Sequence, residues 1–139
     1  MTDLSTNLLD LVIANRILAH EDVVDAFGHV SFRHPDNPDR YWLSCSRAPE
    51  LVVAEDLMEY NLDGEPINQG DRTMYAERPI HGGVYQARPD VQAVIHNHSM
   101  TVIPYGVTNT PLRPIFHLAA VIGELVPVWD IRDTFGDTN

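Results

Sequence analysis

The chain contains no lysine, and all nine of its basic residues are arginines. A lyase that works through a Schiff base needs a lysine amine, so this chemistry is excluded. Arginine also binds carboxylates through a planar, two-pronged guanidinium that lysine cannot reproduce. If the protein handles carbanions, we expect a metal ion to accept the electrons instead.

Other features are also scarce. A single cysteine, Cys45, cannot form an intramolecular disulfide, which favours a reducing cytoplasm. No apolar run approaches the roughly 18–20 residues of a membrane span. The N-terminus, MTDLSTNLLD, is acidic where a secretory signal is basic, so we expect no targeting segment. With 20 acidic residues against 9 basic ones, the net charge of −11 disfavours nucleic acid and membrane partners.

What remains is typical of one α/β domain. The 139 residues are 44% hydrophobic, which is enough for a core. Apolar spacing predicts helices, and alternation between turn signals predicts strands and at least two hairpins. We expect a layered α/β fold around a mixed, largely antiparallel sheet. The predicted helices are 4–20, 74–87, a short one within 99–107, and 116–122. The predicted strands are 29–33, 41–45, 57–61, 65–67, 91–99 and 127–130.

The most informative motif is His96-Asn97-His98, which follows the apolar run VQAVI. In a strand, residues two apart project to the same side. The apolar run predicts an internal strand, so two imidazoles should leave its end side by side. This arrangement is typical of divalent-metal ligands. The alternative is a pair of surface histidines at a strand end.

Glu77 is an acidic residue on the predicted helix upstream of this motif. His81 lies four residues later and should share its face of the helix. Glu77 near a metal would act as a general acid or base, or as an additional ligand. The alternative is a local pair on a solvated helix. We expect His81 itself to be a half-buried helix residue.

Two further segments carry small polar side chains at strand ends. Gly28-His29-Val30-Ser31 begins a predicted strand after a glycine turn and can present donors to an anion. Ser46 and Arg47 follow the next strand and are suited to binding a carboxylate. A plain turn and a solvated arginine are the alternatives for these segments.

Together these motifs resemble the class II aldolase/adducin family over about residues 10–135. The resemblance rests on Glu77, HNH at 96–98, GHVS at 28–31 and YNLDG at 60–64. It implies a three-layer α/β/α sandwich, a divalent metal held by histidines, and acid–base work by Glu77. It also implies a cyclic homotetramer with active sites between subunits.

The chain departs from this family in ways that bear on the substrate. The family's sugar-phosphate aldolases read Gly-Asn-x-Ser in the early loop and carry two serines before the glutamate. Here His29 and the pair Tyr75-Ala76 stand at those places, which disfavours a phosphorylated substrate. The segments SRAPELV and PIFHLAAVIG look more like the decarboxylase branch, which acts on hydroxylated, carboxylated rings or muconic semialdehydes.

The third metal histidine of the family lies beyond the position of Asn139. We therefore expect residues 1–139 to form a single domain that is incomplete at its C-terminus. Otherwise the third ligand comes from His81, His117 or a neighbouring subunit.

The expected function is a metal-dependent carbon–carbon lyase that decarboxylates a small hydroxylated carboxylate through a metal-stabilised enolate. Its expected site residues are Glu77 as the acid; His96 and His98 as ligands of Zn, Mn, Fe or Co; Ser46 and Arg47 at the substrate carboxylates; and His29 and Ser31 near the ring oxygen. One alternative is an aldolase or epimerase acting on an unphosphorylated hydroxy-acid. Another is a non-catalytic, adducin-like module.

Overall fold

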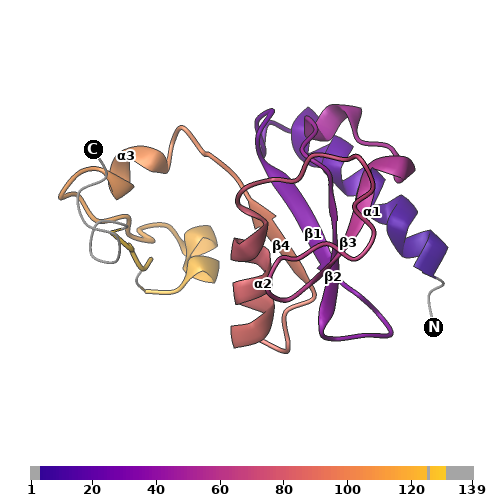
Figure 1. Ribbon diagram of the computed structural model, residues 1–139. Helices are drawn as coiled ribbons and strands as arrows, with labels where there is room; N and C mark the ends of the chain where they lie inside the picture. The colour runs from indigo at the N-terminus through magenta and orange to yellow at the C-terminus, as the bar shows by residue number, and fades with distance from the viewer. Residues whose placement is uncertain (1–3, 125, 131–139) are drawn as a thin grey trace, which may run out of the picture. The chain divides into compact units, whose positions relative to one another are not determined.

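A four-stranded antiparallel sheet forms the centre of the first of two compact units, Met1–His98 and Ser99–Asn139 (Figure 1). The computed structural model describes residues 4–124 and 126–130. The sheet order is β3-β2-β1-β4, and all three pairings are antiparallel. The expected hairpin between the first two strands is confirmed, whereas the described residues contain no parallel pair. The strands are β1 (His29–Arg33), β2 (Arg40–Ser44), β3 (Leu57–Asn61) and β4 (Ala93–His96).

Helices cover both faces of this sheet, as Figure 1 shows, which confirms the three-layer arrangement. The helix α1 (Leu4–His20) matches its predicted bounds and packs on one face, while α2 (Arg78–Ala87) packs on the other. Two short 3-10 helices, η1 (Pro49–Leu51) and η2 (Ala54–Asp56), lie between β2 and β3.

Each face of the sheet has its own apolar core because side chains alternate along a strand. On β2, Trp42 packs with the α1 side, whereas its neighbours Tyr41 and Leu43 pack with Tyr85 of α2. The core on the α1 side consists of Leu11, Val12, Val30, Trp42, Val52 and Leu57. Tyr85 is 1% exposed, so α2 is fixed firmly against the sheet.

The helix α2 begins four residues later than its predicted start at position 74. Glu77 is the residue that precedes the first helical position, and Pro79 stands in the first turn, where a missing N–H donor is tolerated. Glu77 was expected within the helix but occupies the position just before it, whereas His81 lies within the helix as expected. The strand predicted at 65–67 is only a single bridge, between Tyr60 and Pro66. Pro66 has no backbone N–H and cannot donate to a longer ladder of hydrogen bonds.

The prediction that β4 is an internal strand is wrong. Among the described residues β4 pairs only with β1, so it lies at an edge of the sheet. Ala93 and Ile95 are exposed, and Val94 and His96 are half-buried. Apolar composition indicates that a face can be buried, but the strand order decides whether a neighbour covers it.

The second unit contains a short helix, α3 (Ile103–Gly106), and a 3-10 helix, η3 (His117–Ile122). The helix predicted at 116–122 is therefore 3-10 in type. The strand predicted at 127–130 is absent, because that segment pairs with no described strand. No described side chain of this unit is buried, and His117 is exposed. The expectation of one domain across 1–139 stays a prediction. None of the helices within the described ranges is long and apolar enough to cross a membrane.

Candidate metal centre

The centre is built on the pairing of His29, the first residue of β1, with His96, the last residue of β4. These two residues are direct partners across the antiparallel strands, so their side chains leave the sheet on the same face. The imidazole rings stack, with centroids 4.9 Å apart and an interplanar angle of 21°. A feature of the strand register therefore brings together two histidines that are 67 positions apart in the sequence.

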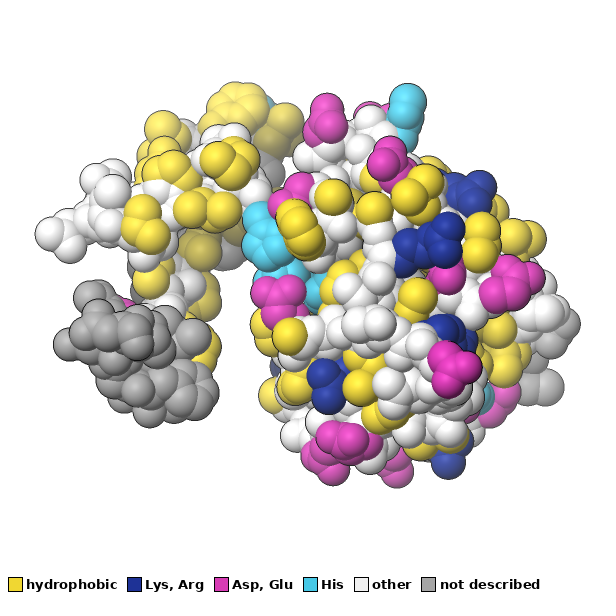
Figure 2. Space-filling model, turned by 45° about the horizontal axis from the view of Figure 1, so that its top comes forward, with side chains coloured by type: hydrophobic (Ala, Val, Ile, Leu, Met, Phe, Trp, Pro, Cys, Tyr) yellow, Lys and Arg dark blue, Asp and Glu magenta, His cyan; other side chains and the backbone are white. Residues whose placement is uncertain are grey.

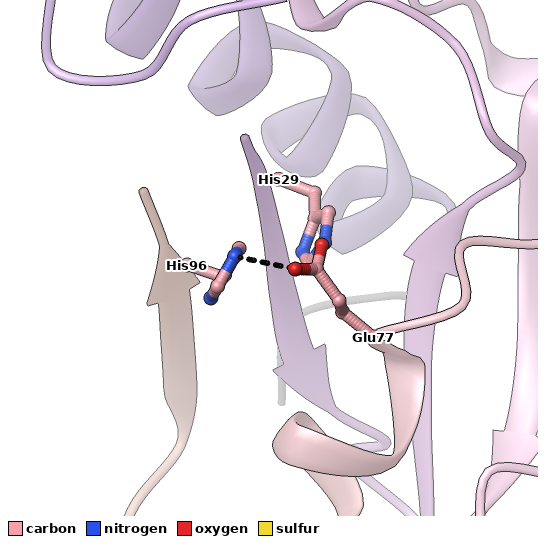
Figure 3. A group of neighbouring side chains, drawn as sticks. All are labelled: His29, Glu77 and His96. Atoms are coloured by element: carbon pink, nitrogen blue, oxygen red, sulfur yellow. Dashed lines mark ion pairs between the residues drawn. The ribbon is translucent and has the colours of Figure 1, made fainter. Parts of the chain in front are cut away.

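Glu77 reaches this pair from the start of α2. Figure 3 shows its carboxylate at the His29 ring, with one oxygen directed toward His96. Glu77 Oε2 lies 3.5 Å from Nε2 of His29, and Oε1 lies 3.3 Å from Nε2 of His96. One carboxylate thus faces two imidazole nitrogens from different strands. Because Glu77 is the residue that precedes α2, packing of the helix on the sheet places its backbone beside the two histidines.

His98 joins the group from two residues beyond the end of β4. Its Nε2 lies 3.0 Å from Nε2 of His96 and 3.9 Å from Glu77 Oε1. Its other ring nitrogen, Nδ1, lies 3.2 Å from both carboxylate oxygens of Asp25. A histidine with a carboxylate at one nitrogen presents the other nitrogen as an electron-pair donor, as metal-ligating histidines do.

Asp25 is itself held by the loop before β1. Its carboxylate accepts hydrogen bonds from the backbone amides of Phe27 and Gly28, at 3.0 and 2.8 Å. Desolvation would raise the pKa of Asp25, but the hydrogen bonds from His98 and from the two amides outweigh it and lower the pKa. The carboxylate is therefore charged at neutral pH and suited to orienting His98.

A buried row of polar groups lies behind His29. Its Nδ1 is 2.7 Å from Nε2 of His81, and Nδ1 of His81 is 2.7 Å from the hydroxyl of Ser31. The same hydroxyl is 2.7 Å from the hydroxyl of Tyr85. All four side chains are essentially inaccessible to solvent. The row fixes the plane and orientation of the His29 ring.

Burial also affects the charge of these rings. Desolvation, together with the neighbouring His96, lowers the pKa of His29 to about 4. Desolvation and the nearby His29 lower the pKa of His81 to about 3. Both rings are therefore neutral at pH 7, and each has one unprotonated nitrogen. A neutral imidazole is the form that binds metals.

The donor set fits a divalent cation. His29, Glu77 and His96 each offer one ligand atom, and these atoms lie within 4.8 Å of one another. Ligand atoms about 2.1 Å from a tetrahedral metal are roughly 3.4 Å apart, close to the separations of 3.3 and 3.5 Å from Glu77. Moreover, His29 Nε2 is buried and has no hydrogen-bond partner. A buried polar atom without a partner is costly, and a cation at this point would satisfy it.

A cavity of about 350 Å³ opens beside the metal centre. Its lining includes Ser46, Arg47, Tyr75 and Glu77. The Arg47 guanidinium is about half exposed and is held by Asp56, with contacts of 3.4 Å. Figure 2 shows histidine side chains beside acidic ones at the surface of this unit. The cavity therefore combines a carboxylate, a guanidinium and an aromatic wall at one place.

The structure brings together most of the predicted site residues. Glu77, His96 and His98 meet in one group, and Ser46 and Arg47 line the adjoining cavity. The roles given to these residues stay predictions. We expected His29 and Ser31 near a substrate ring, but His29 contacts Glu77, and the Ser31 hydroxyl is buried against His81 and Tyr85.

The prediction that His81 is a half-buried helix residue is wrong, since it is fully buried. Both of its ring nitrogens are engaged, by His29 and Ser31, so it does not supply the third metal ligand. Sequence reasoning also missed Asp25 and Tyr85. Glu77, His81 and Tyr85 follow one another at intervals of four residues. This spacing was a signal that one side of α2 presents polar groups to the sheet.

Comparisons of the sequence and the fold with known proteins show the family. Residues 9–137 match the family described as Class II Aldolase and Adducin N-terminal domain. The chain is 41% identical over 117 residues to decarboxylase tropJ of Talaromyces stipitatus, covering 83% of this chain and 44% of the relative. It is 30% identical over 115 residues to 3,4-dihydroxyphthalate decarboxylase of Arthrobacter keyseri, covering 76% of this chain and 45% of the relative.

Among solved structures, the L-fuculose 1-phosphate aldolase of Glaciozyma antarctica superimposes with a TM-score of 0.72 at 29% identity. The match covers 83% of this chain and 49% of that one. The chain thus spans about half the length, or slightly less, of the proteins it matches. The family indicated by the sequence motifs is the one found: the chain belongs to the class II aldolase and adducin family.

Proposed function

We propose that this protein is a metal-dependent carbon–carbon lyase that decarboxylates a hydroxylated ring or muconate-type carboxylate. The observation that carries the proposal is the Glu77 carboxylate shared by His29 and His96 beside a cavity that contains Arg47. Two relatives, decarboxylase tropJ and 3,4-dihydroxyphthalate decarboxylase, are named for the same reaction class. The name of the second includes a hydroxylated aromatic dicarboxylate.

The residues that would hold the metal are the predicted ligands His96 and His98, with His29 as a further donor and Glu77 as an additional ligand only in the resting state. Imidazole and carboxylate donors suit Zn, Mn, Fe or Co. When bound, such an ion would supply Lewis acidity, which stabilises negative charge on a substrate oxygen next to the breaking bond.

The side chains around the cavity would position the substrate. Arg47 lines the cavity beside its ion-pair partner Asp56, and its guanidinium can bind a carboxylate in the two-pronged geometry. The Ser46 hydroxyl would donate to the same carboxylate. Tyr75, which also lines the cavity, would pack against the ring. A substrate held in this way lies directly next to Glu77.

Glu77 would complete the reaction by acid catalysis. When the bond to the leaving carboxylate breaks, CO2 departs and the electron pair stays on the ring carbon. A proton held on a Glu77 carboxyl oxygen then moves to that carbon, either directly or through one water molecule. The Glu77 side chain is 42% exposed, so it can take up a new proton from solvent for the next turnover.

The test uses the full chain with zinc, manganese or cobalt and 3,4-dihydroxyphthalate as the probe. We expect CO2 release by the wild type and loss of at least about a hundredfold in rate for Glu77→Gln. The matched control is Glu50→Gln, because Glu50 is also a glutamate but is exposed on η1. Full CO2 release by Glu77→Gln, or a wild type that binds no metal, would overturn the proposal.

A second candidate is an aldolase that acts on an unphosphorylated hydroxy-acid with the same centre. The superposition with a solved fuculose-phosphate aldolase favours it. Measuring aldehyde release against CO2 release from the same reaction separates the two activities. A non-catalytic, adducin-like module would release neither product and would purify without metal. The homotetramer and the cytoplasmic location stay predictions.

A further inference from the structure

Phe27 is an exposed aromatic residue that has no part in the reaction described above. Its side chain is 71% exposed, and the residue lines the cavity beside Glu77. It lies in the loop between α1 and β1, two residues before His29. A large aromatic side chain left in solvent at the edge of a ligand cavity offers a flat apolar surface that a bound molecule can cover.

The backbone that carries Phe27 is held firmly. The Asp25 carboxylate accepts hydrogen bonds from the amides of Phe27 and Gly28, and the Gly28 amide also lies 3.2 Å from the Asp25 carbonyl oxygen. A Cβ atom at Gly28 would lie 2.7 Å from Cβ of Val24 and 3.1 Å from the carbonyl oxygen of His96, so the loop packs tightly against the end of β4. Phe27 therefore extends from a fixed loop, and few side-chain torsions have to be ordered when a ligand binds.

The rest of the cavity offers few polar groups. Its described lining, apart from Phe27 and Tyr75, consists of three alanines and three polar residues: Ala26, Ala48 and Ala76, with Ser46, Arg47 and Glu77. A saturated hydroxy-acid carries several hydroxyls, and each one that is buried needs a hydrogen-bond partner. A flat ring with one carboxylate and few other oxygens needs fewer partners and gains from apolar walls.

The size and charge of the cavity favour the same kind of molecule. Its volume of about 350 Å³ is at the small end of the range of about 300–1,000 Å³ for small-molecule sites, which suits one substituted ring. Arg47 is the single cation among the described lining residues, and Asp56 already contacts it at 3.4 Å. A carboxylate can share this guanidinium, whereas the second charge of a phosphate would have no partner there.

We propose that Phe27 is a specificity-determining residue that stacks on the substrate ring, so that the site selects a flat aromatic carboxylate over a saturated hydroxy-acid of the same size. The inference rests on the proposed function, because it takes the cavity beside Glu77 as the substrate site. Phe27 does not reach the reacting atoms in this role. Its loss should therefore reduce the affinity for the ring and leave the chemical step unchanged.

The first experiment measures ligand affinity by titration calorimetry of the full chain at pH 7 with zinc present. The probes are 4-hydroxybenzoate and trans-4-hydroxycyclohexanecarboxylate, which carry the same carboxylate and hydroxyl on a flat and on a puckered ring. We expect the wild type to bind the flat probe about tenfold more tightly, and Phe27→Ala to bind the two almost equally. A wild type without this preference, or a Phe27→Ala variant that keeps all of it, would overturn the inference.

Two other substitutions at the same position separate stacking from plain apolar contact. Phe27→Tyr keeps an aromatic ring and should keep the preference for the flat probe. Phe27→Leu keeps an apolar side chain without a flat face and should lose most of the preference. If Phe27→Leu discriminated between the probes as well as the wild type does, stacking would not be the cause and the inference would fail.

The matched control is Ile67→Ala. Ile67 is also an exposed apolar residue of the first unit, at 47%, but it does not line this cavity. Its replacement should leave both affinities unchanged. If Ile67→Ala reduced the preference as much as Phe27→Ala, a general effect of losing apolar surface would explain the result, which would contradict the assignment to Phe27.

A second experiment separates this inference from the lyase proposal. With 3,4-dihydroxyphthalate as the probe, Phe27→Ala should raise KM for CO2 release about tenfold with little change in kcat. CO2 release by the wild type with an unchanged KM in Phe27→Ala would refute the role of Phe27 and leave the lyase proposal intact. A protein that prefers the flat probe through Phe27 but releases no CO2 would refute the lyase proposal and support the role of Phe27.

Discussion

Two adjacent glycines in α2 give a sharp test of how this helix, and with it Glu77, is placed. Gly82 is buried, and a Cβ atom built there would lie 2.1 Å from the Leu62 carbonyl oxygen and 2.9 Å from its carbon. Gly83 is exposed, and a Cβ there would meet nothing within 4 Å. Because the two glycines are neighbours in the same helix, an alanine at either position changes the helix propensity equally. The two variants therefore differ mainly in the atoms that the new methyl group meets.

The magnitudes follow from this geometry. Ordinary contact begins at about 3.4 Å, so Gly82→Ala requires the helix or the Leu62 backbone to move by more than an ångström. Overpacking costs about 1–3 kcal/mol, and a backbone neighbour that cannot rotate away favours the upper end. The better helix propensity of alanine returns about 1 kcal/mol. We expect Gly82→Ala to lower the free energy of unfolding by about 2 kcal/mol, and Gly83→Ala to raise it by about 0.5–1 kcal/mol.

Urea denaturation of the two variants and the wild type measures this difference directly, and a thermal melt should show shifts of about 4 °C per kcal/mol. Zinc affinity provides a second readout, because displacing α2 moves Glu77 and His81 relative to β1. Gly82→Ala should weaken zinc binding and Gly83→Ala should not. The reasoning is refuted if Gly82→Ala is as stable as Gly83→Ala.

Three further predictions concern the centre and its cavity. His96→Ala should abolish stoichiometric zinc binding, which elemental analysis of the purified protein measures; retention of a full equivalent would contradict the assigned centre. Arg47→Lys should raise KM for the carboxylated probe about tenfold with little change in kcat, since lysine lacks the two-pronged geometry. A tenfold fall in kcat with an unchanged KM would contradict a binding role for Arg47. The pKa of His81 is about 3 in the folded, metal-free protein and 6.5 in the unfolded chain, so the unfolded chain binds a proton at a higher pH. The free energy of unfolding should therefore fall by about 2 kcal/mol between pH 7 and pH 5 because of this residue. Urea titrations should show a smaller fall for His81→Phe, and an equal fall would contradict the assignment.

Much of the fold was predictable from local patterns. The apolar spacing of residues 4–20 and the alternation of 29–33 gave the correct helix and strand, because periodicity and turn residues act within a few positions. The same local logic failed where a partner was needed. The segment 127–130 has the composition of a strand, but it pairs with no strand in the described part of the chain. The segment 65–67 forms only one bridge because it contains Pro66.

The sequence by itself determined the chemistry available to this protein. The absence of lysine from residues 1–139, the His96-Asn97-His98 motif and Glu77 predicted metal-assisted rather than Schiff-base chemistry, which stays a prediction. The motif order indicated the family, and this is confirmed. Both inferences need only residue types and short spacings.

Only the tertiary structure decided which groups meet. The register of β1 against β4 places His29 opposite His96, and the packing of α2 on the sheet places His81 between His29 and Ser31. Such contacts join residues about 50 or more positions apart, so no local pattern encodes them. They arise because burying both faces of the sheet allows a single arrangement of strands and helix, and that arrangement converts scattered histidines into one centre.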